Sequence, residues 1–130
     1  MPLLTIHVQV GRTAQELGEL LDAVHASVVE AFDVPPRDRY QIVHEHEASH
    51  LVVQDTGLGI ERTRDVMVVQ VTSRPRPQQQ KQAFYRLLCE QLERHCGIRA
   101  TDVVVAITEN TDDDWSFGLG RAQFLTGELS

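Results

Sequence analysis

The start of the chain carries its first candidate for chemistry. Pro2 follows Met1 directly and precedes the apolar run Leu3–Ile6. Initiator methionine is usually removed when the second residue is small, and proline qualifies. Removal leaves Pro2 with a free secondary amine, and an α-amino group titrates near neutral pH. Held at the start of a buried strand, this amine can act as an acid, a base or a Schiff-base former. Otherwise Pro2 merely begins the chain.

Two arginines form the second candidate. Arg74 and Arg76 are separated by one residue, and side chains two apart on an extended chain point to the same side. Pro75 and Pro77 favour that extended conformation. Adjacent guanidiniums repel each other unless an anion joins them, and each can donate two hydrogen bonds to a carboxylate. The pair therefore indicates a carboxylate substrate, with two solvated surface arginines as the alternative.

Asp38 is the third candidate, in a turn before an expected strand. Aspartate is common in turns, and its role can be purely local, as Asp102 would illustrate in the second half of the chain. A functional Asp38 would hold a cationic Pro2 or activate a water molecule. A nearby carboxylate raises the pKa of an amine, whereas cations such as Arg74 and Arg76 lower it.

A histidine-rich segment invites a metal-binding interpretation. It contains His44, Glu45, His46, Glu47 and His50. On a strand, His44 and His46 share a face. Zinc sites need three or four ligands and a supporting shell, and a third ligand is not evident here. We therefore expect no metal site in this segment.

Composition narrows the class of protein. The 130 residues suit one domain, and 42% hydrophobic with 24% charged residues is typical of a globular chain. The net charge of −7 argues against nucleic acid and anionic membranes as partners. There is no apolar span and no signal peptide, so we expect a cytoplasmic protein. Cys89 and Cys96 lie about 10 Å apart along a helix, too far for a disulfide.

The chain repeats one unit with an offset of 64 residues. The same offset relates four pairs of identical residues: Arg12 and Arg76, Gln15 and Gln79, Asp38 and Asp102, Glu45 and Glu109. We divide the chain into units of about 2–48 and 66–110, followed by a C-terminal arm at 111–130, all in a single domain.

Each unit is expected to be strand, helix, strand. The first has a strand at 3–10, a helix capped by Thr13 that runs to about Phe32, and a strand from Tyr40. The second has a strand at 66–71, a helix from Pro77 to Gly97 and a strand at 103–107. The helical apolar stripes are Leu17, Leu20, Leu21, Val24 and Val28, then Phe84, Leu87, Leu88 and Leu92.

A helical crossover implies that the two strands of each unit are parallel. We predict an α/β protein, a two-layer α+β sandwich with a four-stranded sheet and both helices on one face. The other sheet face then needs a partner, which an oligomer would supply. The loop at 55–60 is glycine-rich but lacks the spacing of a phosphate-binding loop. The arm holds Trp115, Phe117 and Phe124, and such an arm packs on a neighbour or walls a pocket.

These features together resemble the tautomerase superfamily. Five longer motifs resemble the bacterial malonate semialdehyde decarboxylase family in particular, and the likeness spans nearly the whole chain. The motifs are Asp38-Arg39-Tyr40-Gln41, Asp55-Thr56-Gly57-Leu58-Gly59, Ser73-Arg74-Pro75-Arg76, Asp114-Trp115-Ser116-Phe117-Gly118 and Phe124-Leu125-Thr126-Gly127.

The resemblance implies a cofactor-independent homotrimer that converts malonate semialdehyde to acetaldehyde and CO2. Pro2 would be its catalytic amine, Asp38 the carboxylate partner, and Arg74 and Arg76 the binders of the substrate carboxylate. The hydrophobic wall of the site would comprise Trp115, Phe117, Phe124 and Leu129. The histidine-rich segment is not part of the catalytic motif.

Two other functions remain open at this point. One is hydration or tautomerisation of a related unsaturated or 2-oxo acid at the same site. The other is a non-enzymatic trimeric interaction protein that keeps the fold. The arginine pair favours the two enzymes, and retention of Met1 in the mature chain would favour the interaction protein.

Overall fold

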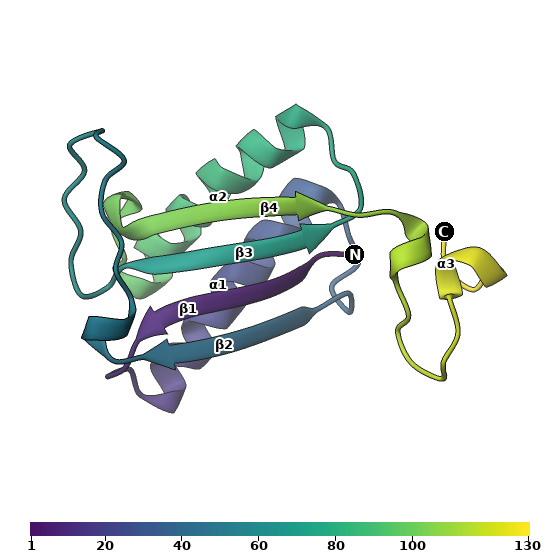
Figure 1. The fold of residues 1–130 in the computed structure, drawn as a ribbon, viewed down its shortest axis with the longest axis horizontal. Helices are drawn as coiled ribbons and strands as arrows, with labels where there is room; N and C mark the ends of the chain where they lie inside the picture. The colour runs from purple at the N-terminus through teal and green to yellow at the C-terminus, as the bar shows by residue number, and fades with distance from the viewer.

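A four-stranded sheet with two long helices on one face makes up most of the molecule (Figure 1). The computed structural model describes residues 1–130. Its strands and α-helices, in chain order, are β1 (Leu3–Gln9), α1 (Ala14–Phe32), β2 (Tyr40–His46), β3 (Met67–Ser73), α2 (Gln78–Cys96), β4 (Val103–Glu109) and α3 (Gln123–Thr126). Three short 3-10 turns are η1 (Ala48–His50), η2 (Ala100–Asp102) and η3 (Asp112–Asp114).

The strand order is β2-β1-β3-β4. β1 pairs in parallel with β2, and β3 pairs in parallel with β4, which confirms the expected direction within each unit. The two units join through antiparallel pairing of β1 with β3. This arrangement relates the units by an approximate two-fold axis, so equivalent residues of the repeat lie at opposite ends of the sheet.

The core lies between the sheet and the two helices. The fully buried residues alternate along β1 and β3, as in a sheet covered on one face. From the helices, the predicted stripe residues Leu20, Val24 and Val28 meet Leu88 and Leu92 in the same cluster. Phe32 and Phe84 pack against each other within this core, with ring centroids 5.1 Å apart and ring planes tilted by 31°.

Local signals explain the helix ends. Thr13 and Glu16 form a capping box at the start of α1, so the expected cap is present. Gly97 ends α2 with a positive φ of 67°, again as expected. Pro77, which we expected at the first helical position, is instead the residue before the helix. Its ψ of 150° is extended, and its carbonyl accepts from the amides of Gln80 and Lys81.

The second sheet face carries no helix (Figure 1). Two large apolar side chains of β2 are exposed on it: Tyr40 is 41% and Ile42 is 47% accessible.

Cys89 and Cys96 are free thiols on α2, as the sequence indicated. None of the helices combines the length and apolar character needed to cross a membrane.

Candidate active site

One cavity of about 550 Å³ collects most of the residues that the sequence singled out. Its lining residues come from the starts of β1 and β2, the end of β3 and the C-terminal arm. Figure 1 shows that these parts of the chain lie at the same end of the sheet. Six of the eight predicted site residues line it, namely Asp38, Arg74, Arg76, Phe117, Phe124 and Leu129. Pro2 is buried directly beside it, next to the lining residue Met1.

The start of the chain and Asp38 face each other. The Met1 amine lies 3.3 Å from Asp38 Oδ2. Asp38 is buried, and its other oxygen, Oδ1, is buried without any hydrogen-bond partner. A buried carboxylate oxygen without a partner costs free energy, so a cationic hydrogen-bond donor placed next to Oδ1 would be stabilised. The two oxygens therefore define an acceptor site at the start of β1.

Opposing effects set the protonation of the amine at the chain start. Burial lowers the pKa of the Met1 amine below its ordinary value, because a buried site disfavours the charged form. Asp38 raises this pKa, and Arg76 and Arg74 lower it further. The net direction is downward, so the neutral form of this amine is favoured more than in an ordinary α-amino group.

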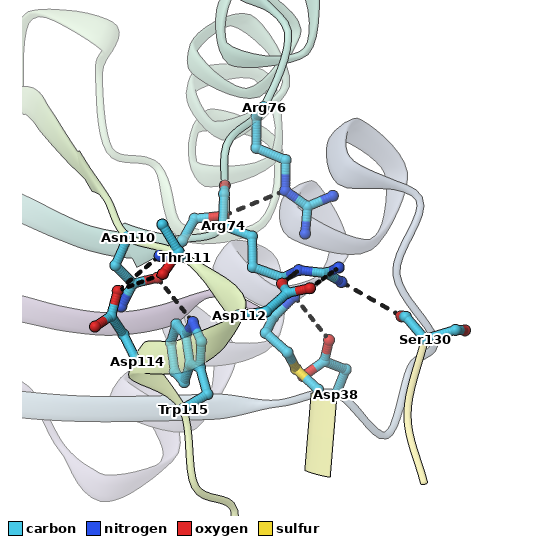
Figure 2. Close-up of polar contacts among 11 residues, drawn as sticks. Asp38, Arg74, Arg76, Asn110, Thr111, Asp112, Asp114, Trp115 and Ser130 are labelled. Atoms are coloured by element: carbon cyan, nitrogen blue, oxygen red, sulfur yellow. Dashed lines mark hydrogen bonds and ion pairs between the residues drawn. The ribbon is translucent and has the colours of Figure 1, made fainter. Parts of the chain in front are cut away.

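Arg74 is held in place by the arm. Its Nε donates to Asp112 Oδ1 at 2.6 Å, and its Nη2 donates to Asp112 Oδ2 at 3.3 Å. Its Nη1 donates to the carbonyl of Ser130 at 3.3 Å, as Figure 2 shows. The guanidinium also lies over the ring of Phe124, 4.1 Å from the centroid. The arginine is thus fixed on three sides while it lines the cavity.

Arg76 is held by the body of the fold. Its Nε donates to Ser73 Oγ at 3.2 Å, and its Nη1 donates to the carbonyl of Phe32 at 3.0 Å. Phe32 ends α1, so the carbonyl belongs to the negative end of that helix. Burial lowers the pKa of Arg76, and Arg74 lowers it further, while Asp38 opposes the shift. An arginine keeps its charge even so.

The arm supplies an aromatic wall. Phe117 lies tilted beside Tyr40 of β2 and meets Phe124 edge to face, with centroids 5.7 and 5.4 Å apart. Trp115 does not line the cavity. Its ring packs against Phe117 at 5.4 Å, and its Nε1 donates to Asn110 Oδ1 (Figure 2). Trp115 therefore supports the wall from behind.

The sequence did not reveal two residues that organise the site. Asp112 orients Arg74, yet it is one of three consecutive aspartates that no pattern distinguishes. Gln123 is buried, accepts from the Phe117 amide and donates to the Gly118 carbonyl. A lone glutamine at the start of a four-residue helix carries no signal for such a role.

The opposite end of the sheet holds the repeat equivalents in a different arrangement. Both carboxylate oxygens of Asp102 are occupied, one by the Thr63 amide and one by the Thr63 hydroxyl. Arg12 pairs with Asp65, 3.6 Å away. No chain start lies there, because Val66 stands where Pro2 stands in the first unit. The constellation of amine, carboxylate and two guanidiniums is present at one end only.

Two family models and a curated relative match the chain. A family model described as "Tautomerase enzyme" matches residues 38–118, and a second model of the same description matches residues 2–60. The chain belongs to the tautomerase family. The "Probable tautomerase YrdN" of Bacillus subtilis is 58% identical over 129 residues, which cover 99% of this chain and all of that protein.

Solved structures give the same fold. A crystal structure of malonate semialdehyde decarboxylase, described as a basis for decarboxylase and hydratase activities, is 52% identical with a TM-score of 0.97. The match covers 98% of this chain and 99% of that one. FG41 malonate semialdehyde decarboxylase, inhibited by 3-bromopropiolate, is 38% identical with a TM-score of 0.94, covering 98% of each chain. A symmetric trimer of fused 4-OT shares the fold at 23% identity and a TM-score of 0.78, covering 96% of this chain and 98% of that one.

Proposed function

We propose that this tautomerase-family enzyme is a cofactor-independent decarboxylase that converts malonate semialdehyde to acetaldehyde and CO2. One observation carries the proposal: an amine at the chain start, a buried carboxylate and two guanidiniums open onto a single cavity. The 52% identity to a malonate semialdehyde decarboxylase supports the choice of substrate. Removal of Met1 would make Pro2 the reacting amine.

Arg74 and Arg76 bind the substrate carboxylate in this proposal. Their guanidiniums line the same cavity and are oriented by Asp112 and by the end of α1. Two fixed donors can hold the carboxylate out of the plane of the rest of the substrate, so that the breaking bond aligns with the carbonyl π system. The apolar side chains of Phe117, Phe124 and Leu129 surround the departing group and favour neutral CO2 over a charged carboxylate.

The protonated amine of Pro2 supplies the electrophile. Loss of CO2 from ⁻OOC–CH2–CHO breaks the bond between the carboxylate carbon and the methylene carbon, and its electron pair moves toward the aldehyde oxygen. A cation beside that oxygen stabilises the resulting enolate. Protonation of the methylene carbon then gives CH3CHO, so the reaction consumes one proton and releases CO2. Asp38 favours the charged form of this amine, because it raises the pKa of the Met1 amine against the effect of burial and should act in the same way on a free Pro2 amine.

The test is direct. The chain with its natural N-terminus is incubated with malonate semialdehyde, and acetaldehyde and CO2 are followed together by NMR. The proposal expects both products in equal amounts, and their loss in Arg74→Ala and Arg76→Ala. Consumption of the substrate without CO2 would contradict decarboxylation while leaving an enzyme at this site.

A second candidate is hydration or tautomerisation of a related unsaturated or 2-oxo acid. The observation in its favour is the lowered pKa of the buried amine, because a neutral amine can act as a base. The name of the YrdN relative, probable tautomerase, points the same way. Turnover of a 2-oxo acid between its enol and keto forms, with malonate semialdehyde left unchanged, would favour this candidate.

We also propose a homotrimer. The sheet face opposite the helices exposes Tyr40 and Ile42, and a second and third copy would cover it. The symmetric trimer of fused 4-OT supports this assembly, because it shares the fold.

A further inference from the structure

Three histidines gather on the sheet face opposite the helices, away from the catalytic cavity. His7 comes from β1, and His44 and His46 come from β2. The His7 ring lies 5.2 Å from the His44 ring and 5.1 Å from the His46 ring, between centroids. The cavity lies at the beginnings of these parallel strands, whereas the cluster lies toward their ends. The proposed reaction uses none of these imidazoles.

Hydrogen bonding fixes the state of His7. Its Nε2 lies 2.9 Å from Gln70 Oε1 on β3, and an amide oxygen can only accept. His7 therefore carries a proton on Nε2, and in the neutral ring its Nδ1 presents a lone pair. That lone pair faces His46 Nε2 at 2.8 Å, so the two facing nitrogens share one proton. Metal-binding histidines show the same pattern, with one nitrogen donating to a carbonyl and the other free to ligate.

The spacing of the two nitrogens selects a geometry. A bond from a histidine nitrogen to a divalent transition-metal ion is about 2.0–2.1 Å long. Two nitrogens 2.8 Å apart, as His7 Nδ1 and His46 Nε2 are, would therefore subtend roughly 85–90° at an ion that both of them bind. That angle suits neighbouring positions of a square-planar or octahedral ion, which Cu²⁺ and Ni²⁺ prefer. A tetrahedral zinc site would need nitrogens about 3.3 Å apart.

We infer that His7 Nδ1 and His46 Nε2 together bind a divalent copper or nickel ion. The proton on His46 Nε2 passes to solvent, and His46 Nδ1 takes up a proton from solvent, so the His46 imidazole stays neutral. His7 Nδ1 and His46 Nε2 then each have a lone pair to bind the ion. No group of three or more His, Cys, Asp or Glu side chains is placed to hold a metal, so the two imidazoles are the side-chain ligands that one chain supplies. The sequence does not indicate a role for His7, because this residue lies 39 positions from His46 and contacts it only through the pairing of β1 with β2.

The test is calorimetric titration of the full, assembled chain with Ni²⁺. We expect one ion per chain, at least a tenfold loss of affinity in His7→Ala and in His46→Ala, and a loss of about tenfold in Gln70→Ala through the misoriented His7. His50→Ala is the matched control, since that exposed histidine belongs to the same segment but not to the contact. It should bind as the parent does.

A second measurement guards against variants that lose the fold. The electron paramagnetic resonance spectrum of the Cu²⁺-loaded parent should show splitting from two nitrogens. Circular dichroism should confirm that each variant is folded. Equal affinity in the parent, His7→Ala and His46→Ala would assign the ion to adventitious surface histidines and overturn the inference. Failure of the parent chain to bind Ni²⁺ or Cu²⁺ at millimolar concentration would overturn it as well.

Discussion

Asp38 and its repeat equivalent Asp102 differ in what their oxygens contact. Asp102 is satisfied by Thr63, whereas Asp38 offers one oxygen to the chain-start amine and leaves the other without a partner. Both occupy turns before a strand, as the repeat indicated. The sequence alone allowed two roles for Asp38, a local role in the turn and a role in the chemistry. The unpaired oxygen of Asp38 favours the role in the chemistry.

Asp38→Asn should shift the pH dependence of turnover. The proposed reaction needs a protonated amine, so kcat/KM falls as pH rises through the amine pKa. Asp38 raises the pKa of the Met1 amine and should raise that of a free Pro2 amine in the same way, so Asp38→Asn lowers this pKa and moves the alkaline limb to lower pH. The measurement is a pH–rate profile of kcat/KM. Asp102→Asn serves as the control and should keep the parent's limb. Identical profiles in the two variants would reduce Asp38 to a turn residue.

Arg74→Ala and Arg76→Ala should each cripple turnover while the fold survives. Loss of a charge-assisted contact to the substrate carboxylate should cost about 2–4 kcal/mol, or roughly two to three decades in kcat/KM. Arg12→Ala is the matched control, because Arg12 is the repeat equivalent of Arg76 at the far end of the sheet. Steady-state kinetics and thermal melts of the three variants test this. Parent-like turnover in Arg74→Ala or Arg76→Ala would place that arginine outside the site.

At the scale of elements, the C-terminal arm decides the shape of the cavity. Phe117 and Phe124 belong to it, and Gln123 ties them together through the Phe117 amide and the Gly118 carbonyl. Asp112, in η3, links the arm to Arg74 beyond the end of β3. The arm therefore positions both the apolar wall and one of the two guanidiniums.

Gln123→Ala should loosen the arm without unfolding the sheet. Truncation leaves the Phe117 amide and the Gly118 carbonyl without their partner, a cost of about 1–3 kcal/mol where such groups stay buried. We expect a rise in KM of roughly tenfold and a melting temperature close to the parent's, since the core does not include the arm. Gln15→Ala, on the exposed surface of α1, is the control. An unchanged KM would show that Gln123 does not shape the site.

Much of the fold was open to prediction because it rests on local patterns. The apolar stripes of α1 and α2, the cap at Thr13 and the end at Gly97 follow from residues close in the chain. The parallel pairing within each unit follows from the length of the crossover. The packing of Trp115 behind Phe117, outside the cavity, could not be predicted in this way. The arm is irregular, so no periodic pattern in the sequence shows which way its side chains point.

For the whole molecule, the uncovered sheet face predicts assembly. Light scattering should give a mass of three chains of 14.7 kDa each. Ile42→Asp places a charge on the exposed face and should weaken the assembly, because a buried unpaired charge is costly. Val52→Asp, on an exposed loop position outside the sheet, is the control. A stable monomer of the parent at micromolar concentration would contradict the trimer.

The central claim is that a free amine at Pro2 performs the chemistry. Two chains that differ only in their start, one at Met1 and one at Pro2, can be released from a cleavable fusion and checked by intact mass. Each is then given malonate semialdehyde, and acetaldehyde is followed by NMR. We predict rapid turnover by the chain that starts at Pro2 and none above background by the chain that keeps Met1, in which the Pro2 nitrogen is an amide. Equal turnover by both chains would contradict the proposed mechanism.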